Sequence, residues 1–123
     1  MTLIKLLRWS IGQIIILIDY ITRPKPMKRS NSQQTKIDQE TQQLSLYQFH
    51  LCPFCVKVRR MIHRLNLNIE LRDAKNNQTY RSELNRGGGK IKVPCLRIEK
   101  DDKTIEWMYE SSLINQYLEE QFN

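Results

Sequence analysis

The sequence HLCPFCVKVRR, residues 50–60, places two of the chain's three cysteines three positions apart, where a helix is expected to begin. Pro53 suits the first turn of a helix. Apolar residues then follow at helical spacing: Val56, Met61, Ile62 and Leu65. Such a cysteine pair is used in three ways, as a disulfide staple, as half of a metal site or as a redox-active dithiol.

Composition argues against the staple. Three cysteines are an odd number and too few for a disulfide-rich secreted scaffold, so we expect a reducing compartment, the cytoplasm. The chain of 123 residues has room for one domain with an extra arm. Its formal net charge of +7 permits attraction to an anionic surface but proves none. The basic residues are scattered except for one run, so no nucleic-acid partner is expected.

A metal site would need more ligands than the sequence offers. Zinc takes about four ligands, and structural sites usually add a second Cys-x-x-Cys or a pair of histidines. Only Cys95, His50 and His63 remain beside the pair. We therefore expect no metal, and keep an iron–sulfur cluster bridged between molecules only as part of an alternative function.

Residues 1–21 form an apolar N-terminal segment that is predicted to be an amphipathic helix. Its uninterrupted apolar run, Ile14–Ile18, is far shorter than the ~20 residues that span a bilayer. Residues 3–21 therefore suit a helix that lies in a membrane interface, and the basic run from Arg23 to Arg29 would add attraction to anionic headgroups. A helix that packs on its own domain or on a second subunit, and a cleaved signal, are the alternatives.

Residues 22–43 are predicted to be a polar linker. Pro24 and Pro26 oppose a regular helix start, and the many Ser, Asn and Gln residues offer little to bury. A short helix over Ile37–Gln43 is the only element considered there.

Residues 44–123 alternate apolar and polar runs, as a folded domain does. Strands are predicted over 44–49, 69–72, 93–99 and 104–109, and helices from Pro53 and over 79–86 and 111–122. The three glycines after residue 86 are expected to form a flexible connection. The order strand, helix, strand, helix, strand, strand, helix indicates an α/β fold with parallel pairing followed by an antiparallel hairpin.

This order places Cys52 at the end of the first strand, immediately before the helix. The unpaired N–H groups and the positive end of the helix dipole stabilise a thiolate over a thiol at such a position, and the thiolate is the nucleophile. Cys55, one turn later, is placed to attack a mixed disulfide formed at Cys52. A Cys-x-x-Cys near a βαβ pattern is typical of a thioredoxin-like redox centre.

Three segments together resemble the glutaredoxin family, with similarity to the N-terminal domain of glutathione S-transferases. They are LYQFHLCPFCVKVRRMIHRLNL (46–67), KVPCLRIE (92–99) and EWMYESSLINQYLEE (106–120). The resemblance covers residues 44–123 and implies a thioredoxin-like β-α-β-α-β-β-α fold with a four-stranded mixed sheet. The N-terminal arm lies outside it.

The resemblance also implies a glutathione site. Pro94 would follow a cis peptide bond, and the backbone of Val93 would pair with the cysteine of bound glutathione. Glu110 and Ser111 would hold its γ-glutamyl end, although Ser111 alone could equally be a helix cap. By resemblance, Cys52 is the attacking thiolate, glutathione the co-substrate, and glutathionylated or disulfide-containing proteins the partners.

Two positions depart from the family pattern. Many glutaredoxins have a lysine shortly before the first cysteine for the glycine carboxylate of glutathione, and this chain has none there. His50, Arg81 or Lys92 could substitute, and the sequence does not choose among them. Cys95, directly after Pro94, is either a third redox thiol or a small apolar core residue.

The sequence thus predicts a glutathione-dependent thiol–disulfide oxidoreductase of the glutaredoxin type, in which Cys55 resolves what Cys52 forms. It would be cytoplasmic, and associated with the inner face of the membrane through residues 3–21. The alternative is a membrane-associated glutathione-binding or iron–sulfur carrier module with little turnover. A redox-inactive adaptor is a third hypothesis, against which the intact cysteine pair counts.

Overall fold

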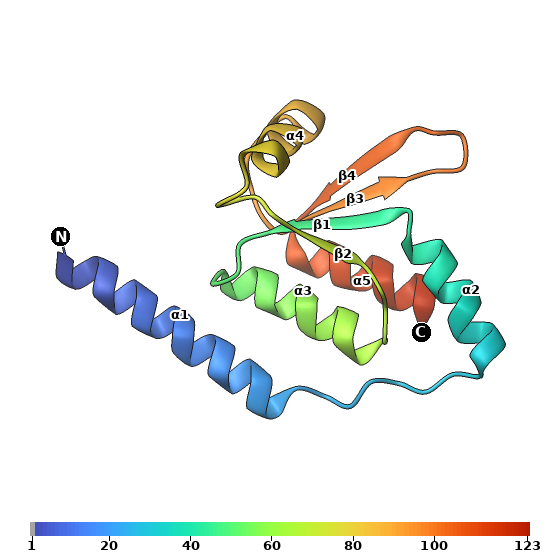
Figure 1. Ribbon diagram of the computed structural model, residues 1–123, viewed down its shortest axis with the longest axis horizontal. Helices are drawn as coiled ribbons and strands as arrows, with labels where there is room; N and C mark the ends of the chain where they lie inside the picture. Colours follow the sequence, from blue (N-terminus) through green and yellow to red (C-terminus); the bar gives the residue numbers. More distant parts are fainter. Residues whose placement is uncertain (1) are drawn as a thin grey trace.

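The computed structural model describes residues 2–123 and is an α/β fold (Figure 1). Its elements in chain order are α1 (Thr2–Thr22), α2 (Asn31–Thr41), β1 (Leu44–Gln48), α3 (Pro53–Arg64), β2 (Glu70–Asp73), α4 (Gln78–Gly88), β3 (Cys95–Glu99), β4 (Ile105–Tyr109) and α5 (Ser111–Phe122). From β1 onward this order confirms the predicted one.

The four strands form one mixed sheet in the order β2-β1-β3-β4. Strand β1 runs parallel to β2 and antiparallel to β3, and β3 pairs with β4 as a hairpin. Helices α3 and α5 cover one face of the sheet, and α4 lies over the other (Figure 1). This is the predicted thioredoxin-like arrangement. Strand β3 begins two residues later than predicted, after Pro94, which has no N–H to donate to a ladder.

The sheet buries side chains on both faces because helices lie over both. Strand β1 is buried along its whole length, with Leu44 and Leu46 on the α3–α5 side and Tyr47 on the α4 side. The larger core lies between the sheet and α3 and α5: Leu44, Leu46, Val58, Ile62, Leu65, Leu67, Ile69, Leu96, Ile98, Ile114, Leu118 and Phe122. Burial of these apolar side chains holds α3 against the sheet, and so determines the position of its first turn.

Residues 22–43 differ from the predicted linker, because they contain helix α2 and pack on the domain. The sequence holds a signal for this helix in Ser30, whose hydroxyl accepts a hydrogen bond from the N–H of Gln33 (3.3 Å) at the helix start. Met27 and Ile37 pack against the main core. The segment therefore buries more than its polar composition indicates.

Arg29 is the main polar tie between this segment and the domain. Its guanidinium donates to the carbonyl of Leu65, which ends α3 (2.7 Å), and to that of Phe122, which ends α5 (2.5 Å). The last carbonyls of a helix have no partner within the helix and carry its negative dipole end. The Arg29 guanidinium thus supplies hydrogen-bond donors to carbonyl groups at the ends of two helices.

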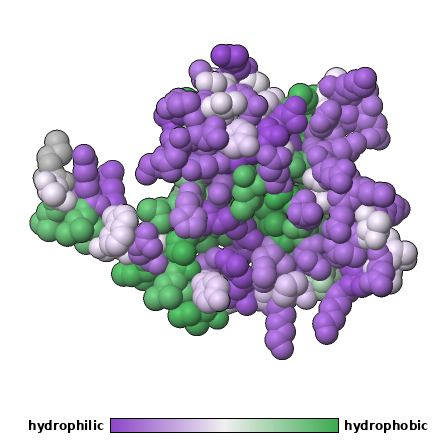
Figure 2. Space-filling model, viewed as in Figure 1, coloured by the Kyte–Doolittle hydropathy of each residue, from purple (hydrophilic) through white to green (hydrophobic). Residues whose placement is uncertain are grey.

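Helix α1 lies beside α3. In contrast to an ordinary surface helix, it turns small and polar residues toward the domain and most of its apolar residues toward solvent. Its buried residues are Gly12 and Asp19, and Ile15 and Ile16 are half-buried, whereas most of its large apolar side chains are exposed, among them Leu3, Leu6, Leu7, Ile14, Leu17, Ile18 and Ile21. Figure 2 shows green, apolar surface along α1 on the side turned away from the domain. Within residues 2–123, no helix has both the length and the apolarity needed to cross a bilayer.

The three glycines after residue 86 are not the flexible connection that we expected. Gly87 and Gly88 belong to α4, and only Gly89, with φ of 87°, ends the helix. A Cβ added to Gly87 would lie 2.0 Å from the Trp107 ring, and one added to Gly88 would lie 1.9 Å from the Tyr109 hydroxyl. These two glycines let α4 approach the β4 aromatics, and so set the distance between helix and sheet.

We expect Gly87→Ala to destabilise the fold by about 1–3 kcal/mol, because the new methyl must displace Trp107. Alanine normally stabilises a helix by about 1 kcal/mol relative to glycine. A loss of stability in Gly87→Ala would therefore indicate close packing, and a gain would indicate helix propensity. Urea unfolding would measure it, with Asn85→Ala, an exposed position of the same helix, as the control. A Gly87→Ala protein as stable as the parent would contradict this packing.

Candidate functional site

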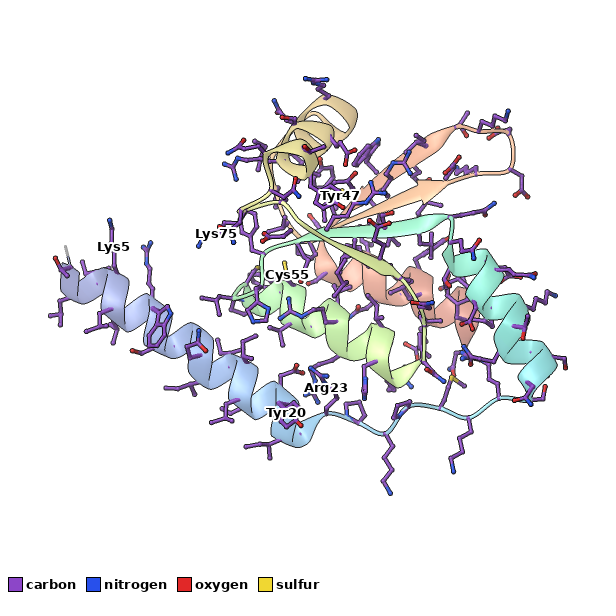
Figure 3. All side chains as sticks on the ribbon, viewed as in Figure 1. Lys5, Tyr20, Arg23, Tyr47, Cys55 and Lys75 are labelled. Carbon is purple, nitrogen blue, oxygen red and sulfur yellow. The ribbon has the colours of Figure 1, made fainter. Side chains whose placement is uncertain are left out.

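The candidate site is built around the first turn of α3. Cys52 occupies the N-cap position with extended backbone angles (φ −73°, ψ 124°), and Pro53 follows as the first helical residue. Cys52 is partly exposed, whereas Cys55, one turn later, is 0% exposed. Figure 3 shows Cys55 between α3 and the sheet. The structure therefore distinguishes two cysteines that the sequence presents as a symmetric pair.

The surroundings of Cys55 keep its thiol protonated. Burial, followed by charge and hydrogen bonding from Cys52, raises the pKa of Cys55 to about 12. The N–H of Phe49, 3.5 Å from the sulfur, and the charge of Arg59 act in the opposite direction and do not outweigh it. A neutral Cys55 thiol is thus held one helical turn behind the partly exposed Cys52.

Arg59 fixes the loop that leads into Cys52. Its guanidinium donates to the carbonyl of His50 (2.8 Å) and to that of Phe49 (3.4 Å), and it also contacts the side-chain oxygen of Gln48. Its positive charge acts on both Cys52 and Cys55. The sequence alone does not reveal this role of Arg59, because its contacts with the loop depend on the tertiary fold.

A cavity of about 300 Å³ borders the start of α3 and contains four of the predicted site residues. The Val93–Pro94 peptide bond is cis, as the resemblance implied. The residues that line the cavity are Phe54, Lys92, Val93, Pro94, Glu110, Ser111 and Ser112. The fold thus brings the cis-proline loop and the start of α5 together on one hollow beside the cysteine pair.

The start of α5 leaves its N-terminal N–H groups available to this cavity. Glu110, not Ser111, is the N-cap residue, and its side chain makes no capping hydrogen bond. Ser111 is instead the buried first residue of α5, so the simple cap role that we considered for it is wrong. Glu110 holds a positive-φ backbone conformation (φ 76°, ψ 124°), which is costly for a non-glycine residue, and such residues cluster at functional sites. A helix start of this kind suits a carboxylate.

Comparison with known protein families matches residues 46–123 to the glutathione S-transferase N-terminal domain. The chain belongs to this family. Comparisons with curated proteins and with solved structures gave no match. Glutathione S-transferase N-terminal domains bind glutathione, and the matched region contains both cysteines of the pair and the whole cis-proline cavity. Within residues 2–123, no three His, Cys, Asp or Glu side chains gather in a way that could hold a metal ion.

In this family member, Cys95 lies in the core and does not line the cavity. It is 0% exposed and packs with Tyr47, Ala74 and Leu84 on the α4 side of the sheet. Burial raises the pKa of Cys95 to about 12, against a hydrogen bond with Tyr109 that lowers it. Its surroundings fit a small apolar core residue better than a third redox thiol.

The three candidates for the missing lysine occupy different places. Lys92 lines the cis-proline cavity, and His50 lines a second cavity together with Cys52. Arg81 donates to the carbonyl of Ala74 (3.3 Å) and borders neither cavity. Two further cations, Arg8 and Lys75, border the Cys52 cavity. Sequence analysis missed both, because Arg8 lies in the arm outside the family resemblance and Lys75 lies in a loop without a motif.

We expect the protein to lose stability between about pH 9 and pH 12. Cys55 and Cys95 have an ordinary pKa of 9.0 and a folded pKa of about 12. The stabilisation linked to each protonated thiol is complete below pH 9 and is lost as the pH rises through the folded pKa. Cys95→Ala should therefore reduce the fall in urea midpoint between about pH 8 and about pH 10.5.

Val56→Ala is the matched control, because it removes buried apolar volume without removing a titrating group. It should keep the pH dependence of the parent protein. If Cys95→Ala and the parent lost stability equally over this range, the buried-thiol interpretation of Cys95 would be wrong.

Proposed function

We propose that the protein is a glutathione-dependent thiol–disulfide oxidoreductase of the glutaredoxin type. Cys52 is the attacking thiolate, and Cys55 resolves disulfides formed at Cys52. Glutathione binds in the cis-proline cavity along Val93 and Pro94, with its γ-glutamyl end toward Glu110 and Ser111. The asymmetry of the cysteine pair is the observation that carries this proposal: Cys52 is partly exposed at a helix start, and Cys55 is buried and neutral one turn behind it.

The reaction on a glutathionylated protein exchanges one thiolate for another at each step. The Cys52 thiolate attacks the glutathione sulfur, a bond forms between these two sulfurs, and the protein thiolate leaves with the electron pair of the broken bond. A second glutathione, as thiolate, attacks the same glutathione sulfur and releases the Cys52 thiolate. The substrate cysteine is reduced, and two glutathiones become one glutathione disulfide.

A disulfide within a protein substrate needs Cys55. After Cys52 has formed a mixed disulfide with the substrate, the Cys55 thiol loses its proton and attacks the Cys52 sulfur. The substrate leaves fully reduced, and the Cys52–Cys55 disulfide is then reduced by two glutathiones. Because the pKa of Cys55 is raised to about 12, its attack requires proton transfer to the leaving thiolate or to solvent. We therefore expect this route to be slower than the one through glutathione.

We expect Cys52→Ser to abolish glutathione-coupled reduction of a mixed disulfide, because it removes the nucleophile. Cys55→Ser should retain most of that turnover and lose reduction of protein disulfides. The assay follows glutathione disulfide formation on both substrate types. Cys95→Ala, which removes the third thiol from the core, serves as the control and should retain both activities. Turnover that survived in Cys52→Ser, or its absence in the parent protein, would contradict the proposal.

We also propose that α1 lies in the interface of an anionic membrane. Its apolar face points away from the domain, so packing of α1 on its own domain leaves this face uncovered (Figure 2). Trp9 and Tyr20 are exposed and about three helical turns apart, so they share one flank of the helix. Aromatic residues of this kind prefer the headgroup region. Lys25 and Lys28, exposed directly after the helix, supply positive charge toward anionic lipid.

We expect the protein to sediment with vesicles that contain anionic phospholipid, and Leu7→Glu or Ile14→Glu to weaken this binding about 10-fold or more. Both side chains are more than half exposed, so the fold should tolerate the change. Leu113→Glu introduces the same charge at an exposed position of α5 and should leave binding unchanged.

Light scattering distinguishes lipid from a second copy of the chain as the partner of this face. A protein that ignores vesicles, but forms a dimer that Leu7→Glu dissociates, would contradict the membrane proposal. That result would assign the face to self-association.

A further inference from the structure

Cys52 opens into a second cavity that is distinct from the cis-proline cavity. It has a volume of about 540 Å³ and is bordered by Arg8 of α1, by His50 and Leu51 of the loop before α3, and by Lys75. A neighbouring hollow of about 380 Å³ shares Arg8 and Lys75 and adds Lys5. Helix α1, which lies outside the family match, thus forms a wall of the space in front of the nucleophile.

The charged residues that border these two hollows are all basic. The residues that border the two hollows include Lys5, Arg8 and Lys75 but neither Asp nor Glu, and within residues 2–123 no ion pair uses any of the three cations. The carboxylate of Asp73 belongs to its own turn, where it accepts from the N–H groups of Lys75 (2.9 Å) and Asn76 (3.2 Å). Figure 3 shows Lys5 pointing to the side of α1 on which the domain and Lys75 lie.

Helix α1 is held in this position by two specific contacts. Asp19 is 3% exposed and pairs with Arg60 of α3 (3.0 Å) and with Arg23 (2.9 Å). Burial alone would raise the pKa of Asp19, but its hydrogen bonds to the two arginines lower it overall. Closer to the site, a Cβ added to Gly12 would lie 3.2 Å from the Cβ of Leu51, so the α1 backbone packs directly on the loop before Cys52.

Arg8 is one turn before Gly12 on the same side of the helix. Arg8 therefore borders the Cys52 cavity because its helix is docked on the domain, and its backbone position does not depend on a free arm. Lys75 is likewise fixed in its backbone by the Asp73 turn. Two cations on separate elements thus border the same cavity as Cys52.

We propose that Arg8 and Lys75 receive negatively charged groups of the disulfide substrate and make Cys52 selective for anionic disulfides. This inference rests on the proposed function and specifies its substrate class. In the step concerned, the Cys52 thiolate attacks one sulfur of a disulfide R–S–S–R, forms Cys52–S–S–R and releases R–S⁻. The two cations attract the carboxylates of R before the attack and offset the repulsion between two anions.

The test compares three small symmetric disulfides: dithiodiglycolate, which is anionic, hydroxyethyl disulfide, which is neutral, and cystamine, which is cationic. Loss of the Cys52 thiol is followed at low ionic strength by acid quenching, alkylation and mass spectrometry. Arg8→Ala and Lys75→Ala should each lower the rate with the anionic disulfide about 5- to 10-fold. The rate with the neutral disulfide should fall much less than the rate with the anionic one, and the rate with cystamine should rise relative to the neutral rate.

Two further variants separate charge at the cavity from other effects. Arg8→Lys keeps the charge and should recover most of the anionic rate. Lys36→Ala removes one positive charge from an exposed position of α2 and should leave all three rates unchanged.

The outcomes separate this inference from the proposed function. If the parent protein reacts with the disulfides, but Arg8→Ala changes all three rates equally or changes none, the inference is overturned and the proposed function stands. If the parent reacts with none of the three, the proposed function is overturned and this inference fails with it.

Discussion

Helix α3 starts at Pro53 beneath the sheet, and this start separates the two cysteines. The apolar face of α3 packs on the core, so the side chain one turn into the helix, Cys55, is buried with it. The residue immediately before the helix, Cys52, remains at the surface, where the helix N–H groups point. Arg59, one turn beyond Cys55, ties the loop before Cys52 to the same helix. A shift of α3 along the sheet would change the exposure of both thiols and the path of the loop together.

Two hollows border this helix start, and they differ in their chemistry. The cis-proline cavity presents Val93 and Pro94, two serines and one residue of each charge, Lys92 and Glu110, of which Glu110 is held in an unusual backbone conformation. The Cys52 cavity presents cations, one of them from outside the family domain. We interpret the first as the place of glutathione and the second as the approach of the disulfide substrate. On this account the N-terminal arm has two faces with two roles, an apolar face toward a membrane and a polar face toward the active site.

The sequence pattern predicted the domain well where local signals and burial agree. Alternation and helical spacing located the strands, α3 and α5 within about two residues, because apolar residues recur along these elements at the spacing of a strand or of a helix. The pattern failed where tertiary contacts decide the outcome. Arg29 orders a polar segment by donating hydrogen bonds to two distant helix ends, and Gly87 lies inside a helix at a position where Trp107 of β4 leaves no room for a side chain. Arg8 could not be assigned to the site, since only the docking of α1 brings it near Cys52.

The most direct test of the central claim is the alkylation rate of each cysteine in the folded protein. Reduced protein is treated with iodoacetamide at neutral pH, and the labelled peptides are quantified by mass spectrometry over time. The account predicts that Cys52 is labelled first, and that Cys55 and Cys95 are labelled only when urea unfolds the chain. Equal labelling of Cys52 and Cys55 in the folded protein, or protection of Cys52, would contradict the division of roles between the two thiols.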